Sequence, residues 1–207
     1  MVAEKRSTSD VGLGQTITLA EAHALQRVAT SERDRMLALV LWTTGCRISE
    51  ATNLRGCDLL PEDQALRLVN RKQRDKRATK RVVVTAEALA ELESYIRENQ
   101  IGPADWLFPG REPGRHLTER QARNVIYNLS TRASVLLPSV RAGLTYGIIR
   151  RIHPHALRHS YATHLLTSGV DLVHVGDQLG HASISNTRKY LHLVTSDRKA
   201  ALAGVRL

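Results

Sequence analysis

The sequence predicts an α+β fold, mostly α-helical, with a small antiparallel sheet on one side of a single domain. Apolar residues recur at helical spacing over most of the 207 residues, which is typical of amphipathic helices. Two short runs, 65–69 and 81–85, instead show the alternation and β-branching typical of strands. Because no internal repeat or linker interrupts the pattern, we expect a flexible leader over 1–17 and one domain over 18–207.

Three helices are expected before the strands. Thr18 and Glu21 form a capping-box pattern, in which each side chain satisfies a free backbone N–H group of the other residue. Gly45 follows a strongly apolar stretch and is the type of residue that ends a helix. The expected helices cover about 19–28, about 32–44 and a short stretch from near Ile48.

The segment 71–81 lies between the two predicted strands and carries seven basic residues among its eleven. A strongly basic β-hairpin is therefore expected. Its positive charges, with Asp75 as the one acid, would repel each other without a counter-surface, which favours contact with a DNA backbone over a merely solvated turn. A third short strand is expected at 106–109, before a loop rich in glycine and proline.

The second half of the sequence returns to helical periodicity. Thr118 and Gln121 form a second capping-box pattern and open a helix that should reach about 131. No element is predicted over 132–151. The other expected helices cover 86–99, 155–168, 171–179 and 184–193, with a weakly helical tail at 196–204.

The charge balance indicates the class of partner. Thirty Lys and Arg against twenty Asp and Glu give a net charge of +10. Such an excess favours a polyanion, because cations that neutralise phosphates release condensed counterions. The longest apolar run, from Met36 to Trp42, is far shorter than the roughly 20 residues of a membrane span. Residues 1–17 lack the apolar core of a signal peptide, and Cys46 and Cys57 lack metal-type spacing, so we expect a cytoplasmic protein with reduced thiols and no membrane partner.

Arg, His and Tyr residues near the C-terminus suggest phosphoryl-transfer chemistry. His155 and Arg158 are three residues apart and so share one helix face. His181 follows Gly180, which is expected to end a helix, and Tyr190 lies nine residues further on. Guanidinium groups bind phosphate oxygens, imidazoles donate hydrogen bonds or move protons, and a phenol can attack phosphorus.

These residues stand in motifs that resemble those of the tyrosine recombinase, or phage integrase, family, which includes the chromosome-dimer-resolving recombinases. Thr44-Gly-Cys-Arg47-Ile-Ser-Glu50 resembles the first arginine box of the family, and His155-Ala-Leu-Arg158-His resembles the second. Leu179-Gly-His181 and Tyr190 are similar to the third histidine motif and the nucleophile. The resemblance covers roughly residues 18–195 and implies a recombinase catalytic domain, a DNA breaking-rejoining enzyme.

The resemblance also implies a role for each matching residue. Arg47 and Arg158 would clamp the scissile phosphate, His155 would accept or relay the tyrosine proton, and His181 would hydrogen-bond a phosphate oxygen. Tyr190 would attack and leave a 3′-phosphotyrosyl link with a free 5′-hydroxyl. Only about 0.1% of an unperturbed tyrosine is phenolate at pH 7, so a base or a cationic environment is needed. The covalent link conserves the bond energy, so no ATP, metal or other cofactor is expected.

In the family, a lysine in the hairpin turn protonates the leaving 5′-oxygen. The glycines that usually surround it are missing here. Counting five residues back from Arg81 selects Lys76 for this general acid, with Lys72 and Lys80 as alternatives.

The expected partners are double-stranded DNA, other copies of the chain in a homo-tetramer on two paired DNA sites, and an accessory DNA-bending protein. Most members of the family carry an N-terminal DNA-clamping domain, whereas only 17 residues precede the first expected helix here. The sequence therefore indicates either a naturally minimal recombinase, like those that invert fimbrial promoters, or a fragment.

Two other functions remain open. A metal-dependent hydrolase could use His153, His155 and His159, since the last two have the i,i+4 spacing of metal ligands, but no HExxH pattern is present. A non-catalytic DNA-binding regulator could retain the recombinase fold. Within the motifs themselves, His159 is interpreted as a packing or capping residue, and Glu50 as a residue that either orients Arg47 or caps its helix.

Overall fold

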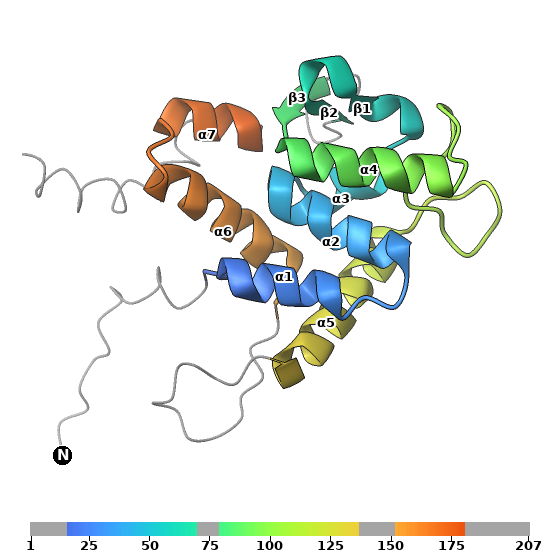
Figure 1. Ribbon diagram of the computed structural model, residues 1–207, viewed down its shortest axis with the longest axis horizontal. Helices are drawn as coiled ribbons and strands as arrows, with labels where there is room; N and C mark the ends of the chain where they lie inside the picture. Colours follow the sequence, from blue (N-terminus) through green and yellow to red (C-terminus); the bar gives the residue numbers. More distant parts are fainter. Residues whose placement is uncertain (1–15, 70–78, 137–151, 181–207) are drawn as a thin grey trace, which may run out of the picture.

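The computed structural model describes residues 16–69, 79–136 and 152–180. Residues 1–15 of the expected leader, the turn of the basic hairpin and the helices expected beyond residue 181 lie outside these ranges. Within them the protein is mostly helical, with a small antiparallel sheet, so the predicted fold class is confirmed (Figure 1).

The first three helices begin and end close to where the sequence places them. Helix α1 spans Leu19–Arg27, α2 spans Glu32–Thr44 and α3 spans Ile48–Thr52. The capping box before α1 is present, because the Thr18 N–H donates to Glu21 Oε2 at 2.7 Å and Thr18 Oγ1 accepts from the Glu21 N–H at 3.2 Å. Residue 17, assigned to the leader, is buried in the core (Ile17, 0% exposed).

The described strands form one antiparallel sheet in the order β1-β2-β3. They span Leu59–Leu60, Ala65–Val69 and Thr79–Val83, and two short 3-10 helices, η3 (Gly56–Asp58) and η4 (Pro61–Asp63), flank β1. Strands β2 and β3 pair as expected, although β3 starts two residues earlier and ends two residues earlier than predicted.

The third strand was predicted at 106–109, and this is wrong, since the third strand of the sheet is β1. Trp106 and Pro109 form only isolated bridges, to Arg55 and His116. Proline has no N–H group to extend a ladder, and the Trp106 ring packs under the Arg55 guanidinium, whose carbon lies 3.8 Å from the ring centroid.

The later helices are α4 (Ala86–Glu98), α5 (Glu119–Leu136), α6 (Pro154–Thr167) and α7 (Leu172–Leu179). Helix α5 runs five residues further than the predicted end near 131. Ile126, Leu129 and Ala133 are all buried, so its apolar face continues past that point.

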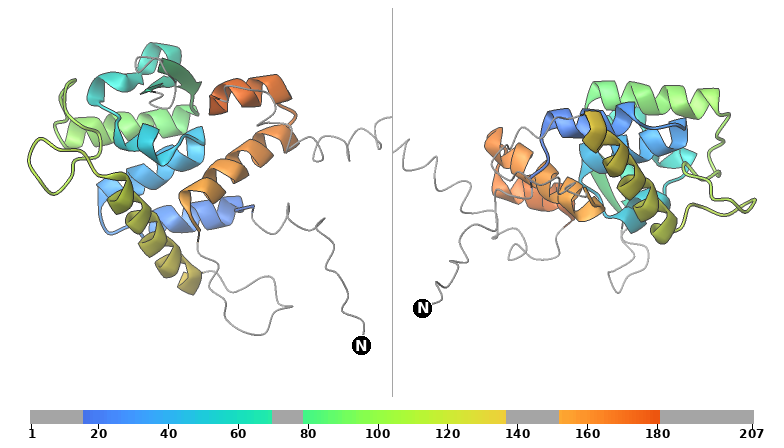
Figure 2. Two further views of the ribbon diagram at one scale, coloured as in Figure 1. Left: turned by 180° about the vertical axis from the view of Figure 1, so that it is seen from behind. Right: turned by 90° about the horizontal axis from the view of Figure 1, so that it is seen from below.

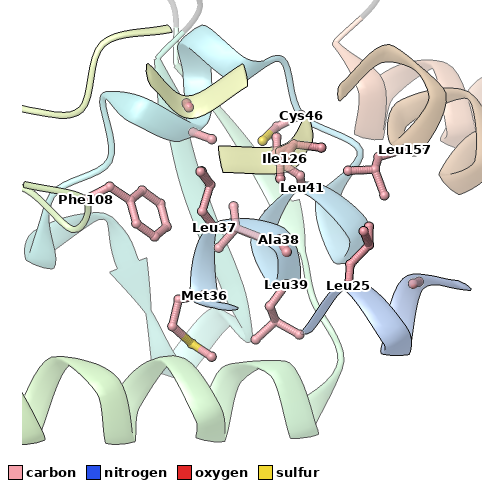
Figure 3. Close-up of a cluster of buried hydrophobic side chains, with 14 of the residues drawn as sticks. Leu25, Met36, Leu37, Ala38, Leu39, Leu41, Cys46, Phe108, Ile126 and Leu157 are labelled. Carbon is pink, nitrogen blue, oxygen red and sulfur yellow. The ribbon is translucent and has the colours of Figure 1, made fainter. Parts of the chain in front are cut away.

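Helix α2 forms the centre of the molecule. Six consecutive residues, Met36–Leu41, are buried, which requires neighbours on all sides of the helix. Helices α1, α4, α5 and α6 supply them, and Figure 3 shows Phe108, Ile126 and Leu157 around the α2 side chains in the same buried cluster. Because Thr44, the last residue of α2, is also buried, the residues that follow it start from a fixed position in the core.

Helices α6 and α7 lie beside this core and share a smaller apolar cluster built on Ala162, Leu166, Val175 and Leu179 (Figures 1 and 2). Helix α7 also contacts β3. The part of the chain that the structure describes contains no helix long and apolar enough to cross a membrane.

Candidate active site

The two arginine boxes of the sequence meet at one pocket of about 220 Å³. Arg47, at the start of α3, and His155 and Arg158, on α6, all line it. The N-terminal half of α5 forms another part of the lining. Residues that are far apart in the sequence are therefore brought together, as the motif pattern predicted.

Glu50 holds Arg47 in two ways. Its Oε1 accepts a hydrogen bond from Arg47 Nη1 at 2.9 Å, and its Oε2 accepts one from the Arg47 main-chain N–H at 2.8 Å. The Glu50 side chain is 2% exposed, whereas that of Arg47 is 26% exposed. The sequence left open whether Glu50 orients Arg47 or caps the helix, and in the structure it does both.

The turn between α2 and α3 needs its glycine. Gly45 has φ +58°, which side-chain-bearing residues rarely adopt, and an added Cβ would lie 2.4 Å from Tyr161 Cδ1. This close packing sets the position of Arg47, two residues further on. Cys46, between them, is fully buried, and burial raises the pKa of its thiol to about 11.

Arg158 is anchored differently from Arg47. Its Nη1 donates to the Gly45 carbonyl at 2.8 Å, and its Nη2 donates to the Leu179 carbonyl at 2.9 Å. These carbonyls lie at the C-terminal ends of α2 and α7, where main-chain carbonyls lack helical partners and carry a partial negative charge. Arg158 is only 9% exposed, so one guanidinium joins α6 to the ends of two other helices.

Two histidines stand at the start of α6. His155 is exposed and lines the pocket, as expected for a residue that handles a proton there. His153 is the N-cap of α6, where its Nδ1 accepts from the Ala156 N–H at 3.1 Å, and it also lines the pocket. The His153 and His155 ring centroids are 6.4 Å apart.

The contribution of α5 to the pocket was not predicted from the sequence. Glu119, Arg123 and Tyr127 line the pocket, and their spacing of four residues places them on one helix face. Arg123 Nη2 lies 3.0 Å from Glu119 Oε2. The capping box at 118–121 located this helix, but no feature of the sequence indicated which face would meet the arginine boxes.

Lys80 lies next to Glu50, the residue that holds Arg47. Its Nζ donates to the Gln178 carbonyl at 3.1 Å and lies 3.6 Å from Glu50 Oε2. The side chain is 13% exposed, and desolvation lowers its pKa, although the Glu50 carboxylate opposes that shift. One of the two alternatives for the hairpin lysine is therefore next to the first arginine box.

The remaining predicted site residues, Lys76, His181 and Tyr190, and the alternative Lys72, lie outside the described residues. His159, interpreted from the sequence as a packing or capping residue, is partly buried on α6, and its carbonyl accepts a hydrogen bond from Thr163 Oγ1. Within the described ranges, no three His, Cys, Asp or Glu side chains converge as a metal site would need.

Comparisons with known proteins agree on one family. The model of the phage integrase family matches residues 16–196. A tyrosine recombinase of Pseudothermotoga lettingae is 32% identical over 172 residues, which are 83% of this chain and 54% of that protein. Tyrosine recombinase XerC of Xanthomonas axonopodis pv. citri is 34% identical over 185 residues, covering 87% of this chain and 55% of that protein. This chain thus spans about half the length of these curated relatives.

Solved structures show the same fold. A crystal structure of XerA recombinase matches with a TM-score of 0.70 and 25% identity, over 93% of this chain and 66% of that chain. The site-specific recombinase XerH bound to palindromic difH substrate matches with a TM-score of 0.67 and 23% identity, over 89% of this chain and 50% of that chain.

Proposed function

This chain belongs to the phage integrase family, and from that premise we propose that it is a tyrosine-type site-specific recombinase that breaks and rejoins DNA through a 3′-phosphotyrosyl intermediate. The observation that carries the proposal is the convergence of Arg47, His155 and Arg158 on one pocket. Arg123 and His153 line it too, and Glu119 is the one acid among the described lining residues, so the pocket suits the charge of a phosphodiester.

The proposed reaction uses these groups together with three residues predicted from the sequence, Tyr190, Lys76 and His181. The Tyr190 oxygen attacks phosphorus, the bond from phosphorus to the 5′-oxygen breaks, and that oxygen leaves as a hydroxyl after it takes a proton from Lys76. Arg47 and Arg158 stabilise the charge that builds on the non-bridging oxygens, with His181 as a further donor. His155, exposed at the pocket, takes or relays the tyrosine proton. Attack by a 5′-hydroxyl reverses the step.

A nicked suicide duplex tests the proposal, because loss of the short strand beyond the nick traps the covalent product. Since the target site is unknown, the duplex is first selected from a randomised library by covalent attachment to the chain. We expect a protein–DNA band on a denaturing gel that Tyr190→Phe abolishes. Tyr127→Phe should retain the band, and loss of the band in that variant instead would assign attack to the phenol that lines the pocket.

The same assay separates the two rival functions. A metal-dependent hydrolase using His153, His155 and His159 would lose cleavage in EDTA, whereas we expect attachment to persist. A non-catalytic DNA-binding regulator would bind library DNA without attaching covalently to any duplex, and Tyr190→Phe would not change that binding.

We extend the proposal to the assembly. The partners are double-stranded DNA in the cytoplasm, three further copies of the chain on paired sites, and an accessory DNA-bending protein. The net charge of +10 supports the DNA partner, and the XerH relative in the fold comparison is bound to its difH substrate. Crosslinking on the selected duplex should give a tetramer, and a ladder that stops at the dimer would contradict this part.

A further inference from the structure

Lys80 contacts groups from two separate parts of the site. It lies on β3, and its Nζ reaches Glu50 on α3, at 3.6 Å from Oε2, and the Gln178 carbonyl on α7, at 3.1 Å. Glu50 Oε2 is the atom that accepts the Arg47 main-chain N–H. One ammonium group therefore links the carboxylate that holds Arg47 to the end of α7.

The last turn of α7 is held by two cations. Lys80 binds the Gln178 carbonyl, and Arg158 binds the next carbonyl, that of Leu179. Gly180 follows with φ +65°, and an added Cβ there would lie 2.8 Å from Lys80 Cδ. The Lys80 side chain thus packs directly against this turn, and the two cations come from β3 and α6.

Lys80 does not line the pocket formed by the described residues. Its Nζ lies near Glu50 Oε2, whereas the Arg47 guanidinium donates to Glu50 Oε1, and 13% of the Lys80 side chain is exposed. Burial of an ammonium group carries a cost unless it is paired and hydrogen-bonded, and Glu50 and Gln178 meet that need. This placement suits a group that acts through Glu50 better than one that touches the reacting phosphate.

We propose that Lys80 is a positioning residue for DNA cleavage. It holds Glu50, and through Glu50 the Arg47 guanidinium, at a fixed position relative to the last turn of α7, to which Arg158 is hydrogen-bonded. The inference rests on the proposed function. It separates Lys80 from the general-acid role, for which Lys80 was an alternative to Lys76.

The two roles differ in how they respond to the leaving group. A general acid matters because the departing 5′-oxygen needs a proton. When sulfur replaces that bridging oxygen, the phosphorus–sulfur bond breaks and a thiolate leaves without a proton, because the pKa of a thiol is far below that of an alcohol. The charge on the non-bridging oxygens still needs Arg47, so a positioning defect persists with sulfur.

The experiment measures the rate of covalent attachment to the library-selected suicide duplex, made with oxygen or with sulfur at the bridging 5′ position. Lys80→Met should slow attachment by up to about 100-fold with both duplexes, the size of effect that misplacement of a catalytic group can produce. Lys80→Arg should stay within about tenfold of the wild-type rate, because arginine keeps the charge and the donors but cannot give up a proton at neutral pH.

Arg67→Met is the matched control. Arg67 lies in the same sheet as Lys80 and also pairs with a buried carboxylate, with its Nε 2.8 Å from Asp58 Oδ1. It does not line the pocket. Its rate per folded molecule should equal that of the wild type. If Lys80→Met does not fold, Lys80→Gln, which keeps a donor for the Gln178 carbonyl but no charge for Glu50, should show the same slow attachment with both duplexes.

Two outcomes overturn the inference. Recovery of Lys80→Met or Lys80→Gln with the sulfur duplex would make Lys80 the general acid, and wild-type rates with the oxygen duplex would remove its role. If the wild-type chain attaches to no duplex in the library, the proposed function fails and this inference fails with it. That result differs plainly from a loss confined to the Lys80 variants.

Discussion

Two arginines line the same pocket but are held by different chemistry. Arg47 is paired with the carboxylate of Glu50 and keeps 26% of its side chain exposed. Arg158 is 9% exposed and donates to main-chain carbonyls at the ends of α2 and α7. The first is oriented by another side chain, whereas the second is part of the packing between helices. We therefore expect the stability of the fold and the chemistry of the site to depend on them in different proportions.

The largest expected effect is that of Arg158→Ala on stability. Two hydrogen bonds from a charged donor are lost, each worth about 1.5–3 kcal/mol, so the free energy of unfolding should fall by about 3 kcal/mol or more. Urea unfolding followed by circular dichroism measures this change. Arg123→Ala removes an arginine of the same pocket whose ion pair among the described residues is an exposed i,i+4 contact, so it should change stability by about 0.5 kcal/mol at most. Equal losses in the two variants would mean that the carbonyl contacts of Arg158 add nothing to stability.

The partners that anchor Arg158 could not be predicted from the sequence. The capping boxes at Thr18 and Thr118 were predicted correctly, because a cap depends on residues three positions apart. The partners of Arg158 are the carbonyls of residues 45 and 179, which every residue type carries. No side-chain pattern can mark a carbonyl as a partner, so only the packing of α2, α6 and α7 reveals it.

Only some of the residues that line the pocket were predicted from the sequence, for a related reason. Arg47, His155 and Arg158 belong to motifs, and the structure brings them together. Tyr127 and Glu119 line the same pocket without standing in any motif. Which face of α5 meets the arginine boxes depends on how its apolar side packs against α1 and α3, and this is a property of the whole fold.

Cys46 connects the two anchors, since it lies between the carbonyl that binds Arg158 and the Arg47 N–H group. Burial raises the pKa of its thiol from an ordinary 9.0 to about 11. The folded state therefore keeps a proton that the unfolded state releases above pH 9, and the stability from this group is present below pH 9 and is lost as pH rises through about 11. The loss should reach about 2 kcal/mol by pH 11.

Urea unfolding of the wild type and Cys46→Ala at pH 8, 9, 10 and 11 checks this. The difference between their free energies of unfolding should shrink by about 2 kcal/mol across the series. Burial is the larger cause that raises the pKa of the Tyr161 phenol to about 12, so its alkaline loss is present in both proteins and most of it cancels in the difference. A constant difference would show that the thiol titrates equally in the folded and unfolded states.

A double-mutant cycle tests the carboxylate anchor of Arg47. Arg47→Ala leaves Glu50 buried with Lys80 as its nearby cation, and Glu50→Gln removes the charge that needs a partner. The two changes should therefore be coupled by about 1–2 kcal/mol in stability, in the range usual for contacting charged residues. Arg158→Ala combined with Glu50→Gln should be additive, because the hydrogen bonds that anchor Arg158 to α2 and α7 go to main-chain carbonyls. Additivity in both pairs would remove the distinction between the arginines.

The smallest expected effect is that of Ser160→Ala, which tests whether the packing of α6 can be changed without changing the chemistry of the site. Ser160, two residues after Arg158, is fully buried, and its Oγ accepts from the Ile17 N–H at 2.6 Å and donates to the Ala156 carbonyl at 2.8 Å. Ser160→Ala leaves the Ile17 N–H without that partner, so stability should fall by about 1 kcal/mol. The hydroxyl faces α1 and not the pocket, so the rate of covalent attachment per folded molecule should not change. A slower rate with unchanged stability would mean that the start of α1 helps to position Arg158, and the packing of α6 could then no longer be treated separately from its chemistry.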